Sequence, residues 1–357
     1  MRKVIAITLI AALCLGLLAA CGGGGGGGGG GQSPGKKSVI LLGSNYGDKS
    51  FFDSAKVGVE KAGVDFADTY TVDVVDITND TTKYDTALQE ASDKKPEIIV
   101  VGTFNMHDPL STAAPQHPDV KYVIFDDKIE GIDNVYSCLF NANQASYLAG
   151  MIGAKVSQTG TIGFVGGMDN TPIIWDFLIG YIEGALSVNP GIKVAVSYAN
   201  DFSNSAKAKE LALAQINTNG ADVIFSVAGA SGAGTIEACA ESGKYVIGVD
   251  SDQAAQYEGR PEQKAIITSA LKRVDNAIYQ AIESVKNGQF KGGYEMLGID
   301  RDCVGIVIDD NTRSVVDAAF IQQVEDAVAK MKSGGIKVSS AFDLSEAETL
   351  AIINSVK

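Results

Sequence analysis

An alternation of short apolar segments with amphipathic helical segments constrains the fold of this chain most strongly, and it occurs twice. In the first series the apolar runs are rich in β-branched residues and lie at 38–42, 70–76, 97–101, 121–125 and 134–140. Helical patterns separate several of these runs. This arrangement is typical of a parallel sheet that helices cover on both faces. The first series therefore predicts one doubly wound α/β lobe over residues 38–140.

The same alternation begins again after residue 140. Its apolar runs lie at 161–165, 192–198, 222–227 and 244–249, with helical patterns between them. Two successive βα series predict two Rossmann-like lobes, and the second covers residues 141–265. A strand at 265–269, a helix at 272–286 and a strand at 304–308 follow. These could return to the first lobe over about 270–300 and cross again over about 301–330, which would give a hinge of several strands. The pattern assigns residues 331–357 to neither lobe.

Residues 1–37 have a different character. A positively charged start, Met1-Arg2-Lys3, precedes an apolar run that is short for a membrane span, so residues 1–20 are expected to be a secretory signal peptide. The small residues directly before Cys21 resemble a bacterial lipobox, in which the cysteine is acylated; an ordinary cleaved signal is the alternative. Ten glycines, 22–31, follow, and residues 21–37 are expected to be a flexible tether. The expected location is the extracellular or periplasmic side of the cell membrane, through a lipid anchor.

Charge and cysteine spacing exclude several kinds of partner. The chain has a formal net charge of -14 and no block rich in lysine or arginine, which makes nucleic acid a poor partner. Cys138, Cys239 and Cys303 are far apart and belong to no paired motif. We expect them to be small buried hydrophobic residues rather than disulfide partners or zinc ligands.

The sequence also lacks the motifs of common enzymes. The only histidines, His107 and His117, lie near prolines in an expected loop without an evident triad partner. Neither a nucleophile elbow around Ser231 nor a phosphate-binding P-loop is present. We therefore expect a protein that is not an enzyme and has no metal or cofactor, although the abundant carboxylates leave a hydrolase with paired acids open.

Polar and aromatic residues follow the expected strands, at the edge where open α/β sheets bind their ligands. The candidate ligand-binding residues are Asp48, Phe51, Phe52, Asp126, Trp175, Phe202, Gly229, Asp250 and Lys272. Aromatic rings on opposing lobes could enclose a flat heterocycle, and a carboxylate such as Asp250 could accept hydrogen bonds from hydroxyl groups. Lys272 would then pair with that carboxylate and donate to the ligand.

Each of these assignments has a simpler structural alternative. Asp48 could cap the following helix without contacting a ligand. Phe51 and Phe52 could belong to the core at the helix start, and the same choice between cleft and core applies to Phe202 and to Trp175, the only tryptophan. Either Asp126 or its neighbour Asp127 could face the cleft or be a surface turn residue.

Several segments together resemble one protein family, in order along nearly the whole mature chain. They are Asp48-Lys-Ser-Phe51, Ala145-Ser-Tyr-Leu-Ala-Gly150, Gly163-Phe-Val-Gly-Gly167, Asp222-Val-Ile-Phe225 and Gly248-Val-Asp250-Ser-Asp-Gln253. These are similar to the basic membrane protein family of bacterial lipoproteins. The resemblance implies the type I periplasmic-binding-protein fold, and a lipoprotein that captures a nucleoside between its lobes and delivers it to the permease of an ABC importer. A ligand-sensing receptor of the same fold, or a binder of another solute such as a sugar, is the alternative.

The resemblance also implies roles for individual residues. Phe51 matches an aromatic that stacks on the base, and Asp250 and Lys272 match positions that bind the ribose hydroxyls. Phe202 resembles an aromatic that faces the cleft from the second lobe. Two departures leave the purine preference of the family open: Phe52 replaces the usual asparagine, and the short segment 43–46 lacks a Thr-Asp pair.

Overall fold

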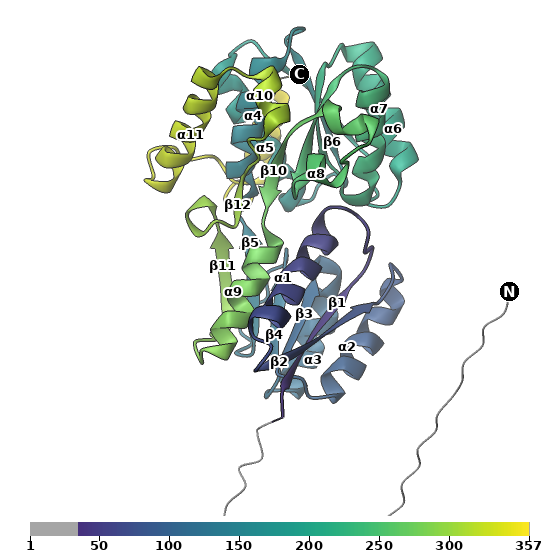
Figure 1. Ribbon diagram of the computed structural model, residues 1–357, viewed down its shortest axis with the longest axis vertical. Helices are drawn as coiled ribbons and strands as arrows, with labels where there is room; N and C mark the ends of the chain where they lie inside the picture. The colour runs from purple at the N-terminus through teal and green to yellow at the C-terminus, as the bar shows by residue number, and fades with distance from the viewer. Residues whose placement is uncertain (1–34, 357) are drawn as a thin grey trace, which may run out of the picture. The chain divides into compact units, whose positions relative to one another are not determined.

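Two six-stranded sheets organise residues 35–356, the part of the chain that the computed structural model describes (Figure 1). The strand orders are β11-β5-β4-β3-β1-β2 in the first sheet and β12-β10-β9-β8-β6-β7 in the second. The mixed α/β architecture with two parallel-sheet lobes is the fold class that the alternating pattern predicts. The expected signal peptide, Cys21 and the glycine run lie outside the described residues.

The first lobe contains a sheet in which all paired strands are parallel. Its strands are β1 (Lys37–Gly43), β2 (Tyr70–Asp76), β3 (Ile98–Gly102), β4 (Lys121–Phe125), β5 (Val135–Phe140) and β11 (Gly293–Leu297). Its helices are α1 (Phe51–Asp65), α2 (Tyr84–Asp93), α3 (His107–Ala113) and α9 (Val274–Lys286). Successive residues of β1 enter different hydrophobic clusters, Val39 and Leu41 one and Ile40 and Leu42 another, because helices cover both faces of the sheet.

The second lobe contains a mostly parallel sheet in which only the pair β10–β12 is antiparallel. Its strands are β6 (Thr161–Gly166), β7 (Lys193–Tyr198), β8 (Val223–Val227), β9 (Tyr245–Asp250), β10 (Ile266–Lys272) and β12 (Val304–Ile306). Its helices are α4 (Ala142–Val156), α5 (Pro172–Val188), α6 (Ser205–Ala214), α7 (Gly232–Glu241), α8 (Gln253–Gln256), α10 (Asp310–Val315), α11 (Ala318–Lys332) and α12 (Glu346–Asn354).

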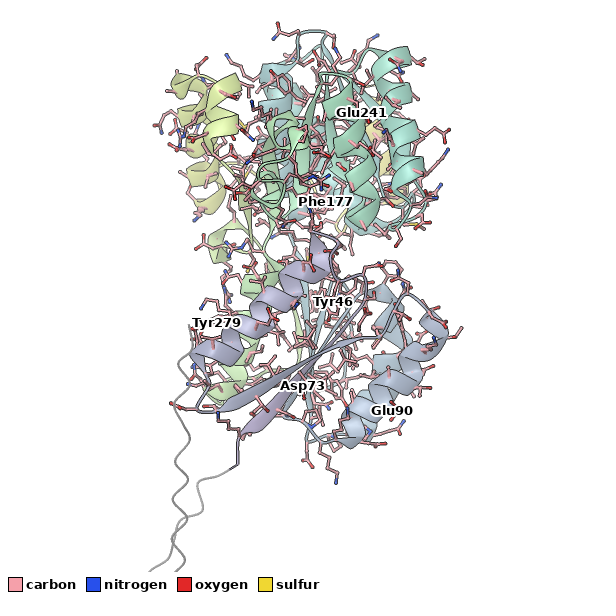
Figure 2. All side chains as sticks on the ribbon, turned by 45° about the vertical axis from the view of Figure 1, so that its right-hand side comes forward. Tyr46, Asp73, Glu90, Phe177, Glu241 and Tyr279 are labelled. Carbon is pink, nitrogen blue, oxygen red and sulfur yellow. The ribbon has the colours of Figure 1, made fainter. Side chains whose placement is uncertain are left out.

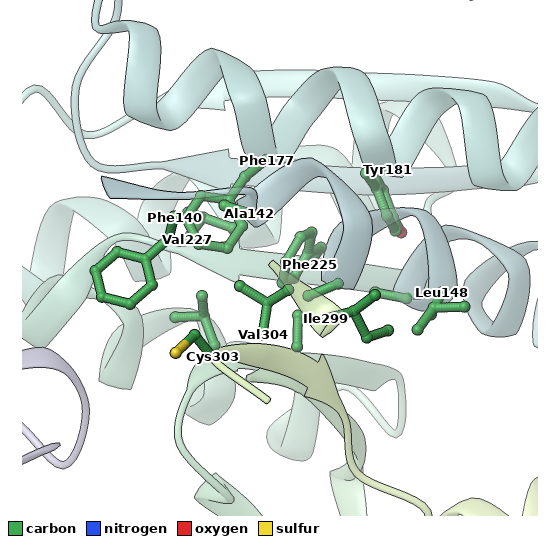
Figure 3. Packing of buried hydrophobic residues seen from close by; sticks show 14 of the residues in the cluster. Phe140, Ala142, Leu148, Phe177, Tyr181, Phe225, Val227, Ile299, Cys303 and Val304 are labelled. Atoms are coloured by element: carbon green, nitrogen blue, oxygen red, sulfur yellow. The ribbon is translucent and has the colours of Figure 1, made fainter. Parts of the chain in front are cut away.

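Aromatic and glycine residues of α5 make the centre of the second lobe dense. Phe177 and Tyr181 of α5 pack on Phe225 of β8, with ring centroids 6.1 and 5.1 Å apart (Figure 3). Helix α4 approaches α5 so closely that a Cβ at Gly184 would lie 1.9 Å from the carbonyl oxygen of Tyr147. Glycine at this position is therefore required by the helix–helix contact.

The chain passes between the lobes after β5, after β10 and after β11. Strand β10 extends to Lys272, where it pairs with Val304 of β12. Lys272 thus ends a strand, whereas the apolar pattern placed it at the start of a helix; that helix, α9, begins at Val274. Strand β11 was not expected, because it lies at a sheet edge, is largely exposed and carries the mixed sequence Gly293-Tyr-Glu-Met-Leu297.

The C-terminal segment packs on the second lobe (Figure 1). The buried carboxylate of Asp176 in α5 accepts hydrogen bonds from Ser340 Oγ at 2.7 Å and from the Ala341 amide at 3.0 Å. At the end of the segment, the amide of Val194 donates to the carbonyl of Val356 at 2.9 Å. Among residues 35–356, no helix has both the length and the apolar character needed to cross a membrane.

Candidate functional site

A cavity of about 560 Å³ lies between the lobes and is lined by loops that follow strands of both sheets. Tyr46 follows β1 and Phe177 lies on α5, on the facing sides of the lobes, and Phe177 forms part of the cavity wall (Figure 2). Eight of the residues singled out in the sequence line the cavity: Asp48, Phe51, Phe52, Asp126, Phe202, Gly229, Asp250 and Lys272. The carboxyl ends of parallel strands thus bring together side chains that are far apart in sequence.

Trp175 is not among the residues that line this cavity. Its ring is buried on α5, and its Nε1 donates to Asp169 Oδ1 at 3.3 Å. Phe177, two residues later on the same helix, lines the cavity instead. Asp127 also lies outside the cavity wall, where its carboxylate is 2.6 Å from His107 Nδ1. Of the two neighbouring aspartates, Asp126 therefore faces the cavity.

A lysine between two buried carboxylates forms the charged part of the site. Lys272 Nζ hydrogen-bonds Asp126 Oδ2 and lies 3.8 Å from Asp250 Oδ1, and the three side chains are at most 8% exposed. Ser50 Oγ donates to the other oxygen of Asp250. Burial raises the pKa of the Asp126 carboxyl, and the neighbouring Asp250 adds to this effect while Lys272 opposes it. One ammonium thus serves two carboxylates, which leaves acceptor capacity for a ligand.

Both carboxylates occupy unusual backbone conformations. Asp126 has φ 58° and Asp250 has φ 67°, values in the left-handed region that aspartate tolerates better than most residues. Asp126 directly follows β4, and Asp250 is the last residue of β9. Strain of this kind collects at functional sites, where the surrounding structure maintains it.

Aromatic rings adjoin the charged cluster. Lys272 Nζ lies 4.4 Å from the centroid of the Phe51 ring, a distance at which a cation is attracted to the ring face. Phe51 packs edge-to-face on Phe52, with centroids 5.1 Å apart, and Phe202 contributes a ring from the second lobe. A Cβ at Gly167 would lie 2.2 Å from the Phe202 ring, so this glycine makes room for the ring at the cavity wall.

Asp48 both caps a helix and lines the cavity. Its carboxylate accepts hydrogen bonds from the amides of Ser50 at 2.9 Å, Phe52 at 2.9 Å and Asp53 at 3.3 Å, at the start of α1. Burial raises the pKa of Asp48 to about 6, against the effect of these amide donors. The helix-capping geometry accounts for the aspartate, and its place in the wall adds negative charge to the site.

Sequence reasoning missed part of the cavity wall. The missed residues are mainly polar groups after β2 and β3 and side chains of α5: Asn79, Thr81, Thr103, Asn105, Ile173, Ile174 and Phe177. The loops after β2 and β3 could have been found by the rule used for the other candidates, that ligand-binding residues follow the carboxyl ends of parallel strands. Within residues 35–356, no group of three or more His, Cys, Asp or Glu side chains could hold a metal ion. The wall suits a small amphipathic molecule that has an apolar ring and several hydroxyl groups.

Comparisons with known proteins identify the family of the chain. The family described as "ABC transporter substrate-binding protein PnrA-like" matches residues 36–341. The "ABC transporter nucleoside-binding protein BmpA" of Lactococcus lactis subsp. cremoris is 32% identical over 93% of this chain and 96% of its own length. "Basic membrane protein A" of Borreliella burgdorferi is 32% identical over 76% of this chain and 79% of its own length. A solute-binding protein of an ABC transporter system from Aeropyrum pernix K1 superposes with a TM-score of 0.77 at 26% identity, covering 90% of this chain and 97% of its own.

Proposed function

The chain belongs to the PnrA-like family of ABC transporter substrate-binding proteins, and from that premise we propose that its cleft captures a nucleoside for delivery to the permease of an ABC importer. The family consists of binding proteins and not of enzymes. The observation that carries the proposal is the buried cluster of Asp126, Lys272 and Asp250 beside a group of aromatic rings. Vicinal ribose hydroxyls would donate to the carboxylates and accept from the ammonium, in charge-assisted hydrogen bonds that are stronger than neutral ones.

The apolar part of the wall fits the base of a nucleoside. Phe51, Phe52, Phe177 and Phe202 come from both lobes and provide ring surfaces for a flat heterocycle. A stacked aromatic pair contributes roughly 0.5–1.5 kcal/mol beyond the burial of area. The asparagines in the wall have both donors and acceptors, so they can pair with the polar edge of a base without selecting one base by charge.

The charge of the wall favours a nucleoside over its phosphate ester. Among the described residues that line the cavity are four carboxyl groups, those of Asp48, Asp126, Asp201 and Asp250, and one cation, Lys272. A phosphate group would add negative charge to this partly desolvated site, where repulsion between like charges is screened less than in water. A nucleoside carries no such charge.

We further propose that the protein is a lipoprotein of the cell membrane. The support is the sequence of residues 1–31 alone, where small residues precede Cys21 and ten glycines follow it. Acylation of Cys21 would anchor the chain, and the tether would let the lobes reach a permease in the same membrane.

Titration calorimetry of the full chain with adenosine, guanosine, inosine, cytidine and uridine tests the ligand class. We expect binding at micromolar concentration or tighter for at least one of these nucleosides, and far weaker binding of its 5′-monophosphate. The absence of heat with every nucleoside, together with binding of a sugar or an amino acid, would refute the proposal. Deletion of the protein distinguishes transport, which predicts lost nucleoside uptake, from sensing, which predicts altered gene expression with normal uptake.

A further inference from the structure

Besides the hydrogen bond from Ser50 to Asp250, the loop between β1 and α1, residues 44–50, contacts the second lobe in two places. At the first, Asn45 Nδ2 lies 3.4 Å from Ser203 Oγ. At the second, Lys49 Nζ donates to the carbonyl of Gln256 at 3.2 Å, and Ser251 Oγ donates to the carbonyl of Lys49 at 3.1 Å. Both contacts join residues that are separated by more than 150 positions in the sequence, and both lie beside the cavity rather than at the connecting strands.

Lys49 makes the larger part of this contact. Its ammonium lies 4.3 Å from the centroid of the Tyr257 ring, and its carbonyl also accepts from Gln253 Nε2 at 3.4 Å. The ammonium thus contacts a carbonyl dipole and a ring face of the second lobe at the same time. These contacts can form only when the β1–α1 loop and the segment 251–257 are close, so their free energy depends on the separation of the lobes.

The β1–α1 loop is held in shape by its own lobe. Asp53 Oδ1 accepts from the Gly47 amide at 2.8 Å, and Asp53 Oδ2 accepts from the Lys49 amide at 3.0 Å. Asp48 accepts from the Ser50 amide at 2.9 Å. Lys49 itself has φ 53°, and this left-handed backbone conformation sets the direction of its carbonyl group. Because these hydrogen bonds lie within the first lobe, we expect them to persist when the lobes separate, so that little conformational entropy is lost when the contact forms.

Ser50 connects the same loop to the ligand-facing carboxylate. Its hydroxyl is fully buried and donates to Asp250 Oδ2, while Asp250 Oδ1 faces Lys272 at 3.8 Å. The hydrogen bond crosses from the first lobe to the second. The hydrogen bond from Ser50 therefore orients Asp250 only when the two lobes are close together.

We propose that Lys49 and Ser50 are positioning residues that stabilise the closed cleft, Lys49 by binding the segment 251–257 and Ser50 by orienting Asp250. This inference rests on the proposed function only for the identity of the ligand. Loss of either contact raises the rate of ligand dissociation and leaves the rate of association nearly unchanged, because diffusion into an open cleft does not involve the contact. For Lys49→Met we expect dissociation to become faster by about tenfold, since the variant retains the length of the side chain but loses the ammonium.

The test compares Lys49→Met and Ser50→Ala with Lys56→Met in the full chain. Lys56 is a matched control because its side chain is 42% exposed on α1 and pairs only with Glu60 on the same helix. Stopped-flow kinetics with the nucleoside that binds best in calorimetry gives the association and dissociation rates. Spin labels at Glu90→Cys on α2 and Glu241→Cys on α7, both exposed and in different lobes (Figure 2), report the separation of the lobes by pulsed electron paramagnetic resonance.

We expect Lys49→Met to shift the label distances toward larger values, with and without nucleoside, and to leave the ligand-free melting temperature near that of the wild type. Ser50→Ala should weaken binding, and Lys56→Met should change neither measurement. Unchanged distances and dissociation rates in Lys49→Met would overturn the inference. If none of the nucleosides binds, the proposed function fails, but the distances in the protein without added ligand still decide the role of Lys49.

Discussion

At the scale of single residues, the site depends on an imbalance of charge. Asp126 and Asp250 share one ammonium, and both carboxylates have little access to water, because each side chain is at most 8% exposed. A buried carboxylate with incomplete pairing is costly unless hydrogen-bond donors are supplied. A ligand with several hydroxyl groups supplies them. The same residues therefore destabilise the empty closed cleft and stabilise the filled one.

The first prediction concerns Asp250. Asp250→Ala should weaken nucleoside binding by about tenfold or more, because an unpaired buried donor costs about 1–3 kcal/mol and ~1.4 kcal/mol corresponds to one decade in affinity. Asp222→Ala is the matched control, because Asp222 is also buried in the second lobe but accepts from Ser157 Oγ at 2.6 Å and from the amides of Gln158 and Thr159. We expect the control to lower the melting temperature and leave the affinity unchanged. Calorimetry and thermal unfolding on both variants check this; unchanged affinity with lowered melting in Asp250→Ala would show that Asp250 is structural.

At the scale of elements, the strands were largely predictable because each buried parallel strand is a short run of β-branched residues. The rule that ligands bind at the carboxyl ends of the strands then indicated Asp250, Lys272 and the pair Asp126-Asp127, but it did not decide which aspartate of the pair lines the cavity. It did not locate Phe177, because which face of α5 points into the cavity depends on how the helix packs. The rule also could not foresee the docking of Ser340 and Ala341 on Asp176, since long-range contacts of irregular segments leave no periodic signal.

The second prediction concerns Asp176, which joins α5 to the C-terminal segment. Burial raises its pKa to about 6 from 3.8, so the folded protein binds this proton more tightly than the unfolded chain does. The free energy of unfolding must then fall as the pH rises through this range, by up to about 3 kcal/mol between pH 4 and 7. Asp176→Asn removes the titration. Urea denaturation gives the unfolding free energy of both proteins. From pH 4 to 7 that of the wild type should fall by up to about 3 kcal/mol relative to that of the variant. A difference that is constant from pH 4 to 7 would contradict the raised pKa.

At the scale of the whole molecule, the net charge of -14 bears on how the protein reaches a membrane. A strongly acidic chain is repelled by anionic lipid headgroups, so electrostatic attraction does not hold it at such a surface. Residues 35–356 contain no helix that could span a bilayer. The lipoprotein proposal requires a hydrophobic anchor, and it assigns that role to Cys21, which directly follows the apolar run at the start of the chain.

The third prediction follows from this requirement. Cys21→Ala in the full chain should move the protein from the membrane fraction to the soluble fraction, because the acyl chains of the proposed anchor would contribute about 0.8 kcal/mol for each buried CH₂ group and the variant cannot carry them. Nucleoside affinity and melting temperature should stay those of the wild type, since residue 21 precedes the lobes. Cys138→Ala serves as the control, because Cys138 is fully buried in the first lobe and its loss affects packing without affecting fractionation. Fractionation of Cys21→Ala with membranes after a high-salt wash would show that another feature attaches the protein, and the lipoprotein proposal would then be wrong.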